Sequence, residues 1–228
     1  MDPLAARVSQ ALAAAADPQR APAMQAYMKS AMPYHGVPAG PLRAALKPLF
    51  ANLSYPTQDE WRADVLSLWR SAAFREERYA AIELSGIPAA RAFQRMDALP
   101  LYEEMIVTGA WWDYVDPIAG QRLWAVLHAD RTAMSAAMRR WASDADAWKR
   151  RASILCQLHA GQQTDLDLLY ACIEPSLSSR FFFLQKAIGW ALRQYARTDA
   201  AEVRRYVAAH ADRLAPLSRR EALKRIGP

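Results

Sequence analysis

The sequence predicts an all-α protein, an α-solenoid built of antiparallel helix pairs. Apolar residues recur at helical spacing along nearly the whole chain, and no segment alternates convincingly between apolar and polar residues as a strand would. Proline falls in or near the breaks between these segments, where its missing N–H costs least. The breaks are short, so successive helices are expected to pack as antiparallel neighbours.

The individual helices follow from the apolar periodicity and from the residues at their starts. Ser or Thr precedes several of them, where a side-chain oxygen can accept from the free N–H groups of the first turn. These expected N-caps are Thr57, Ser143, Thr164, Ser179 and Thr198. The expected helices cover residues 3–16, 21–30, 40–51, 58–70, 74–85, 98–108, 117–128, 130–141, 144–158, 165–173, 180–196, 199–211 and 216–226.

The spacing of the helix pairs distinguishes between two all-α architectures. A bundle would satisfy antiparallel pairs as well as a solenoid would. The pairs recur roughly every 35–45 residues, which is in the range of two-helix repeats of the HEAT type. Stacked pairs form a long concave face that suits an elongated partner. We therefore expect a single HEAT-like domain over residues 1–228, curved, with a basic concave face.

Composition excludes several classes of protein. Hydrophobic residues make up 53% of the chain and there is no low-complexity tail, which is typical of a folded protein. No apolar run approaches the ~20 residues that span a bilayer, and the N-terminus lacks the pattern of a signal peptide. The two cysteines, Cys156 and Cys172, occupy apolar positions of predicted helices, which favours buried thiols in a reducing compartment. The expected location is the cytoplasm.

Positive charge is concentrated in the C-terminal part of the chain. Residues 1–138 carry 13 Lys and Arg against 14 Asp and Glu, whereas residues 139–228 carry 16 against 9. Most of the basic residues in the second part are arginines, whose guanidinium group forks onto phosphate oxygens. This distribution indicates either a polyanionic partner or simply a soluble basic surface.

The segment from Trp111 to Pro117, WWDYVDP, is the first that stands out. Adjacent residues on a helix point about 100° apart, so Trp111 and Trp112 cannot both face one core, and we expect at least one to be exposed. Asp116 followed by Pro117 is typical of an N-cap and the first helical turn. A capping carboxylate can also face a cleft, so a functional role for Asp116 stays open beside the structural one.

Two further segments combine aromatic and basic residues. In Trp148-Lys149-Arg150-Arg151, Trp148 and Arg151 share a helix face, where Arg151 could stack on an aromatic ring or pair with a carboxylate or phosphate. Arg150 by itself is typical of a solvated surface position.

The third segment runs from Phe181 to Tyr195. Phe181 and Phe183 are expected in the core. Glycine inside a helix costs ~1 kcal/mol relative to alanine, so Gly189 indicates close approach of another backbone or of a ligand. Lys186 and Arg193 lie on the glycine stripe and are candidates for phosphate contacts.

Other familiar chemistry has no support in the sequence. The four histidines are scattered without metal-ligand spacing, and the cysteines form no CxxC pair. There is no GxGxxG, no P-loop and no GxSxG motif, so hydride transfer, phosphoryl transfer and triad hydrolysis are not indicated. A carboxylate flanked by Trp and Arg remains.

With these segments in view, the sequence resembles the AlkD family of alkylpurine DNA glycosylases, which are built from HEAT-like repeats. The similar stretches cover most of the chain in order, and the elements WWDxVD and FFxxKAIGWALR are specific to that family. The stretches are Tyr27-Met28-Lys29, LWRSAAFREERYAAIEL (68–84), WWDYVD (111–116), WKRRASILCQL (148–158), TDLDLL (164–169), FFFLQKAIGWALRQYARTD (181–199) and SRREALKRI (218–226).

The resemblance implies roles for particular residues. It places Trp112, Trp190 and Asp116 around the deoxyribose of the lesion, with Arg151 as the active-site arginine that holds a phosphate or orients Asp116. It also implies that the base is not flipped into a pocket, unlike the usual rule for glycosylases. Tyr114 stands where a smaller residue, often Thr, is expected. Expected DNA contacts come from Tyr27, Lys29, Trp111, Arg150, Lys186 and Arg193.

The expected activity is hydrolysis of the N-glycosidic bond of cationic alkylated purines, such as 3-methyladenine and 7-methylguanine, in duplex DNA. Asp116 would stabilise the positive charge that develops on the sugar, and the reaction needs no metal and no cofactor. A monomer that binds double-stranded DNA at the nucleoid is expected. Two alternatives stay open: a non-catalytic DNA-binding scaffold, and a protein-interaction solenoid with an apolar groove.

Overall fold

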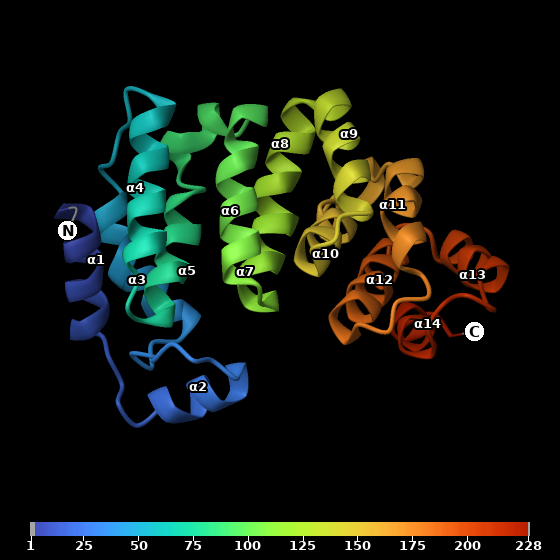
Figure 1. Cartoon of the computed structure of the whole chain (residues 1–228), viewed down its shortest axis with the longest axis horizontal. Coiled ribbons are helices and arrows are strands. Elements are labelled where there is room, and N and C mark those ends of the chain that lie inside the picture. Colours follow the sequence, from blue (N-terminus) through green and yellow to red (C-terminus); the bar gives the residue numbers. More distant parts are fainter. Residues whose placement is uncertain (1–2, 228) are drawn as a thin grey trace. The chain divides into compact units, whose positions relative to one another are not determined.

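The computed structural model describes residues 3–227, and all regular structure in this range is helical (Figure 1). The all-α prediction is confirmed. Contacts divide the chain into two compact units, one ending at Gln94 and the other beginning at Arg95. The curvature and the basic concave face of the expected solenoid stay predictions.

The first unit, over its described residues 3–94, contains five α-helices and one 3-10 helix. α4 packs on α5, and α1 packs against α3, α4 and α5. The core between these helices holds large side chains that are almost completely buried, among them Leu12, Leu46, Trp61, Trp69 and Leu84. The elements are α1 (Pro3–Ala14), α2 (Ala21–Met28), α3 (Ala39–Phe50), α4 (Gln58–Ser71), α5 (Arg75–Leu84) and η1 (Pro88–Phe93).

The second unit continues with antiparallel helices that pack on their successors. α9 packs against α10 and α11, α10 against α12, and α12 most extensively against α14. This order of contacts is consistent with a solenoid. The elements are η2 (Met96–Ala98), α6 (Leu99–Gly109), α7 (Trp112–Pro117), η3 (Ile118–Leu123), α8 (Trp124–Ala129), α9 (Arg131–Ala142), α10 (Ala147–Leu155), η4 (Gly161–Gln163), α11 (Leu166–Ile173), η5 (Glu174–Ser176), α12 (Phe182–Tyr195), α13 (Ala200–Ala209) and α14 (Pro216–Leu223).

The predicted helix starts are correct to within three residues except the one at residue 117, but most predicted caps are wrong. Thr57 does cap α4, accepting from the Glu60 N–H at 3.3 Å. At three other starts an aspartate just C-terminal to the predicted Ser or Thr takes the role, because its carboxylate reaches the free N–H groups of the first turn. These caps are Asp146, Asp165 and Asp199, in place of Ser143, Thr164 and Thr198. Ser179 does not cap α12, which begins after Phe181.

Both cysteine thiols are buried and free, as the sequence predicts. Burial raises the pKa of Cys172 to about 12, so the thiol stays protonated at neutral pH. Among residues 3–227, no helix combines the length and the apolar character needed to cross a membrane. The same residues contain no group of three or more His, Cys, Asp or Glu side chains arranged to hold a metal ion.

Candidate active site

Asp116 lies inside a helix rather than at its start. The Trp111 carbonyl accepts from the Val115 N–H at 3.0 Å, so the helix has already begun at Trp112. Pro117 stands within it and is followed by a π-helical segment, Ile118–Leu123, whose wider turn relieves the crowding that a proline ring causes in a helix. The prediction that Asp116 is an N-cap and that the helix starts at residue 117 is therefore wrong.

Arg151, on α10, pairs with both carboxylate oxygens of Asp116. Its Nε donates to Oδ1 at 2.7 Å and its Nη2 donates to Oδ2 at 2.8 Å, a two-pronged arrangement that fixes both side chains. The side chains of Arg151 and Asp116 are only 4% and 10% exposed. Of the roles that the sequence left open for Arg151, the pairing with a carboxylate is the one observed.

The same guanidinium group reaches a third helix. Arg151 Nη1 donates to the main-chain carbonyl of Phe183, in the first turn of α12. Arg151 therefore joins α7, α10 and α12 at one point. Three nitrogens of its buried guanidinium group each donate to an oxygen on a neighbouring helix. A buried charge needs partners of this kind, since burial without them is costly.

Burial changes the acidity of the central carboxylate. The pKa of Asp116 lies above the ordinary value of 3.8, chiefly because burial disfavours the ionised form. The hydrogen bonds and positive charge of Arg151 oppose this rise, and the nearby carboxylate of Asp113 adds to it. The site thus holds a carboxylate in a medium of low polarity with one cation beside it, where its charge acts strongly on any group that approaches.

A cluster of aromatic rings surrounds the point where the three helices meet. The ring centre of Phe183 lies 5.1 Å from those of Trp111 and Trp148, and the two tryptophan rings are 6.0 Å apart. Phe181 adds an edge contact to Trp148 at 5.9 Å. The sequence places Phe181 in the core, but its side chain is partly exposed because it precedes the first turn of α12. Phe183 is half-buried within the cluster.

Trp112 and Trp190 occupy positions consistent with the implied site. Trp112 stands one turn before Asp116 on α7 and so shares its helix face. Trp190 follows Phe183 by seven residues on α12 and therefore shares the face of that ring. Both indoles are half-buried, as is Trp111. The expectation that Trp111 or Trp112 is exposed is met only in part: Trp111 packs into the aromatic cluster, and each of the two side chains keeps part of its surface exposed.

The glycine stripe of α12 faces another helix. A Cβ on Gly189 would lie 2.9 Å from the Ser218 carbonyl and 2.5 Å from the Glu221 Cβ, so the close approach that the sequence predicts is that of α14. Glu221 also pairs with Lys186 at 2.9 Å and with Arg193 at 2.5 Å. The two candidate phosphate ligands therefore share an internal carboxylate, which leaves the triad with one net positive charge.

The remaining predicted DNA contacts are distributed over both units. Arg150 is half-buried rather than solvated, and its Nε has no hydrogen-bond partner among the described residues. Tyr27 and Lys29 belong to the first unit, at the end of α2, and both are exposed. Tyr114, the departure from the expected pattern, is fully buried, so its bulk adds to the core of the second unit.

Sequence reasoning missed two participants in the site. The Phe183 carbonyl leaves no trace in the sequence, because any residue supplies that group. Glu221 is the only acid in the basic stretch SRREALKRI, and an isolated acid of this kind is a usable signal for an internal ion pair.

Two comparisons with known proteins find matches to this chain. The sequence profile of a family described as "DNA alkylation repair enzyme" matches residues 8–226. A solved structure described as a predicted DNA alkylation repair enzyme from Enterococcus faecalis is similar to this chain, with a TM-score of 0.77 and 27% sequence identity. The similarity covers 92% of this chain and 96% of that one. No curated protein sequence matches significantly. The profile match spans nearly all of the sequence, and the chain therefore belongs to the family of DNA alkylation repair enzymes.

Proposed function

We propose that the protein is a monofunctional DNA glycosylase that hydrolyses the N-glycosidic bond of cationic alkylated purines in duplex DNA, as the first step of base excision repair. The observation that carries the proposal is the buried Asp116 carboxylate, whose orientation Arg151 fixes from α10. Asp116 shares its own helix, α7, with Trp112. Membership of a DNA alkylation repair family supports DNA as the partner.

The chemistry of the substrate explains why a single carboxylate suffices. Alkylation at N3 or N7 gives the purine a positive charge, which makes it a good leaving group without a proton from the enzyme. As the bond to the sugar breaks, the positive charge moves onto the sugar. A preorganised anion beside that sugar stabilises the transition state more than the ground state, because the sugar is neutral at the start.

The Asp116 carboxylate keeps capacity for this role although it is paired. An ionised carboxylate has about four acceptor positions, and Arg151 fills one on each oxygen. The remaining positions can accept from the attacking water and align it with the sugar. We propose that Arg151 acts by positioning Asp116, and that Trp112 and Trp190 contact the sugar through their π faces, which favour a cation.

Binding to the duplex would depend mainly on its phosphates. Phosphate contacts fix the register of a protein on DNA without reading sequence. We propose that Lys186, Arg193 and Arg150 contribute from the second unit, and Tyr27 and Lys29 from the first, with Trp111 supporting the site from within the aromatic cluster. A monomer acting without base flipping, with substrates such as 3-methyladenine and 7-methylguanine, completes the proposal.

The direct test is base release. Purified protein is incubated with duplex DNA carrying 7-methylguanine or 3-methyladenine, and free bases are separated from DNA by chromatography. We expect the methylated purine in the free fraction and an abasic site in the strand. An unmodified duplex and a duplex with the neutral lesion 1,N6-ethenoadenine should release little. Equal release of neutral lesions, or none of cationic ones, would refute the mechanism.

A non-catalytic scaffold is a second candidate, favoured by one observation. Asp116 is mostly buried and already neutralised by Arg151, and a structural ion pair between helices has the same geometry. A scaffold would bind alkylated duplex with a salt-dependent affinity and release no base. The same assay, run at enzyme excess so that a single slow turnover is seen, separates the two candidates.

A further inference from the structure

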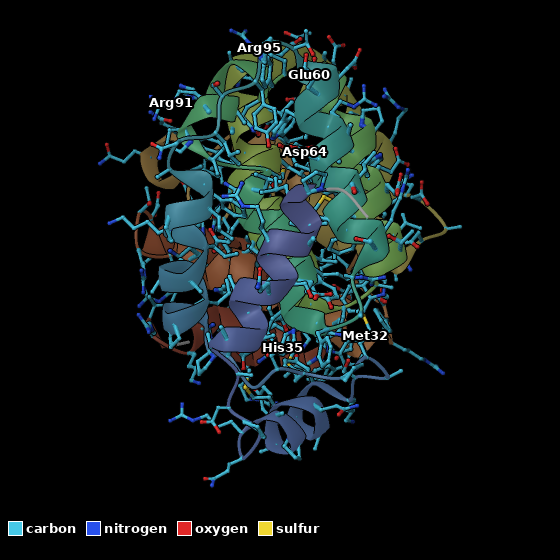
Figure 2. The ribbon with its side chains drawn as sticks, turned by 90° about the vertical axis from the view of Figure 1, so that its left-hand side faces the viewer. Met32, His35, Glu60, Asp64, Arg91 and Arg95 are labelled. Atoms are coloured by element: carbon cyan, nitrogen blue, oxygen red, sulfur yellow. The ribbon has the colours of Figure 1, made fainter. Side chains whose placement is uncertain are left out.

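The helix α2 stands apart from the other helices of the first unit. It does not pack broadly against any of them, and only Met28 of its residues is buried (Figure 1). Figure 2 shows α2 beyond the labelled residues Met32 and His35, which lie between it and the remaining helices. Its end presents Tyr27, 76% exposed, and the exposed Lys29. A helix with so little packing needs another means of holding its position.

Glu76, at the start of α5, supplies that means. Its carboxylate is completely buried and accepts three successive main-chain N–H groups of the segment that leads away from α2. The His35 N–H donates to Oε2 at 3.1 Å, and the Gly36 and Val37 N–H groups donate to Oε1 at 2.9 and 3.0 Å. Hydrogen bonds to an ionised acceptor are about twice as strong as neutral ones.

The segment held by Glu76 also touches the chain that enters α2. The Asp17 N–H donates to the His35 carbonyl at 2.9 Å. Gly36 has a φ of +83°, and a Cβ there would lie 2.1 Å from the Asp17 carbonyl oxygen, so only glycine fits. The chain segments before and after α2 therefore meet at one point, and Glu76 fixes that point.

A second set of contacts secures the far end of the same loop. The Arg75 N–H donates to the Pro33 carbonyl at 2.9 Å, and Arg75 Nη1 donates to Ser30 Oγ at 3.2 Å. The Tyr34 and Tyr79 hydroxyls are 2.8 Å apart. Since all of these partners belong to α5 or to the loop after α2, the position of α2 is set by α5 through polar contacts.

The charge around α2 indicates what it contacts. Between Asp17 and Asp59 the chain contains no acidic residue. Arg20 is paired with Asp17, whereas no carboxylate among the described residues pairs with Lys29. An exposed aromatic ring next to an unneutralised cation, in a stretch of sequence without acids, suits a nucleic acid strand, because phosphates attract the cation and sugars or bases pack on the ring.

We propose that Glu76 is the positioning residue that holds α2 as a preformed arm, so that Tyr27 and Lys29, the DNA contacts of the proposed function, are already in place before the duplex binds. The inference rests on the proposed function only in taking duplex DNA as the partner. It does not depend on the excision chemistry, because α2 carries none of the groups around Asp116. Loss of Glu76 is expected to weaken DNA binding and to leave the excision step itself unchanged.

The test compares Glu76→Gln with Glu83→Gln, which removes a partly exposed carboxylate two turns further along α5 whose contact with Arg43 is long, at 3.8 Å. Two quantities are measured for each variant: the Kd for an unmodified duplex, and the first-order excision rate of 7-methylguanine at saturating enzyme. Tyr27→Ala is expected to raise Kd at least about fivefold. Glu76→Gln should produce a comparable rise, and Glu83→Gln none.

The double variant Glu76→Gln with Tyr27→Ala shows whether Glu76 affects DNA binding by positioning α2 or by a general loss of structure. If Glu76 acts through the arm, the effects of the two substitutions on Kd are not additive, because the first already displaces the ring that the second removes. Additive effects, an unchanged Kd, or a lower saturating excision rate in Glu76→Gln would overturn the inference.

Two outcomes keep this test distinct from that of the proposed function. If the wild type binds duplex but excises nothing, the glycosylase proposal fails and the Kd comparison still decides on the arm. If Glu76→Gln does not fold, Ser30→Ala replaces it, since it removes only the contact with Arg75 Nη1 and the loop bonds made by the hydroxyl. An unchanged Kd in Ser30→Ala would then count against the arm.

Discussion

Two nitrogens of Arg151 each donate to a different oxygen of Asp116, at 2.7 and 2.8 Å, although the two residues are 35 positions apart in sequence and stand on different helices. The pair is nearly buried, so neither side chain can reorient without leaving a charge unpartnered. This relationship fixes the direction of the carboxylate before any substrate arrives.

The first prediction concerns the charge of Asp116. Asp116→Asn keeps the shape of the side chain and removes its negative charge. Loss of one aimed electrostatic group should lower the single-turnover excision rate of 7-methylguanine on the order of 10²-fold or more. The control is Asp167→Asn, which removes an exposed carboxylate on α11 of the same unit. An excision rate close to that of the wild type, in a variant that folds normally, would remove Asp116 from the mechanism.

The second prediction concerns pH. Because the pKa of Asp116 is raised and the ionised form is the active one, the excision rate should fall with decreasing pH at a higher pH than for an exposed aspartate. Arg151 opposes the rise, so Arg151→Met should raise the pKa of Asp116 further and move the acidic limb of the pH–rate profile to higher pH. The profile is measured in single turnover. An acidic limb at the same pH in both proteins would show that another group controls it.

The third prediction concerns the contact between α12 and α14. Gly189→Ala places a methyl group against the Ser218 main chain, where there is no space, so we expect a loss of ~1–3 kcal/mol in the free energy of unfolding. Gly40→Ala is the matched control, because nothing lies within 4 Å of its Cβ position. It should be neutral or stabilise the protein by up to ~1 kcal/mol. Urea denaturation measures both variants. A stable Gly189→Ala protein would contradict the packing.

The fourth prediction concerns Glu221. Hydrogen bonding to Lys186 lowers the pKa of Glu221 below its ordinary value of 4.5. The ion triad of Glu221, Lys186 and Arg193 therefore stabilises the fold fully when the pH is above 4.5, and this contribution is lost as the pH falls through the lowered pKa of Glu221. Glu221→Gln should lack this pH dependence. Comparison of thermal unfolding between pH 7 and pH 3 measures the difference between the two proteins.

Glu221→Gln should strengthen the binding of duplex DNA although it removes an ion pair from the fold. Glu221→Gln releases Lys186 and Arg193 from their shared carboxylate, so duplex binding should tighten at low salt and depend more steeply on salt concentration. Fluorescence anisotropy titrations at several salt concentrations measure this slope. Weaker binding in Glu221→Gln would mean that the α12–α14 contact, rather than free charge, determines the affinity.

Much of the fold follows from local rules that the sequence obeys. Helix positions are set by apolar periodicity and by proline, and both signals are local, so the predicted and observed ranges agree closely. The close approach at Gly189 was also predictable, since a glycine in a helix interior has a cost that something must justify. The resemblance brought Asp116 and Arg151 into one site before their contact was known.

The sequence predictions that were wrong concern residues whose structure depends on contacts with distant parts of the chain. Asp116 and Pro117 have the local pattern of a helix start, but the helix begins earlier because Trp111 docks against rings from α10 and α12. Lys186 and Arg193 look like free cations until α14 brings Glu221 to them. Tertiary contacts of this kind override local preference, and one sequence does not reveal them.

The bond from Arg151 to the Phe183 carbonyl has a practical consequence for mutagenesis. An alanine substitution at residue 183 would leave this contact in place, because every amino acid at that position still offers the same oxygen to the guanidinium. On the acceptor side, only a change in the backbone itself would disturb it, such as an amide-to-ester replacement or a one-residue deletion in the loop before α12. Tolerance of many side chains at residue 183 should therefore not be taken as a sign that this position is dispensable.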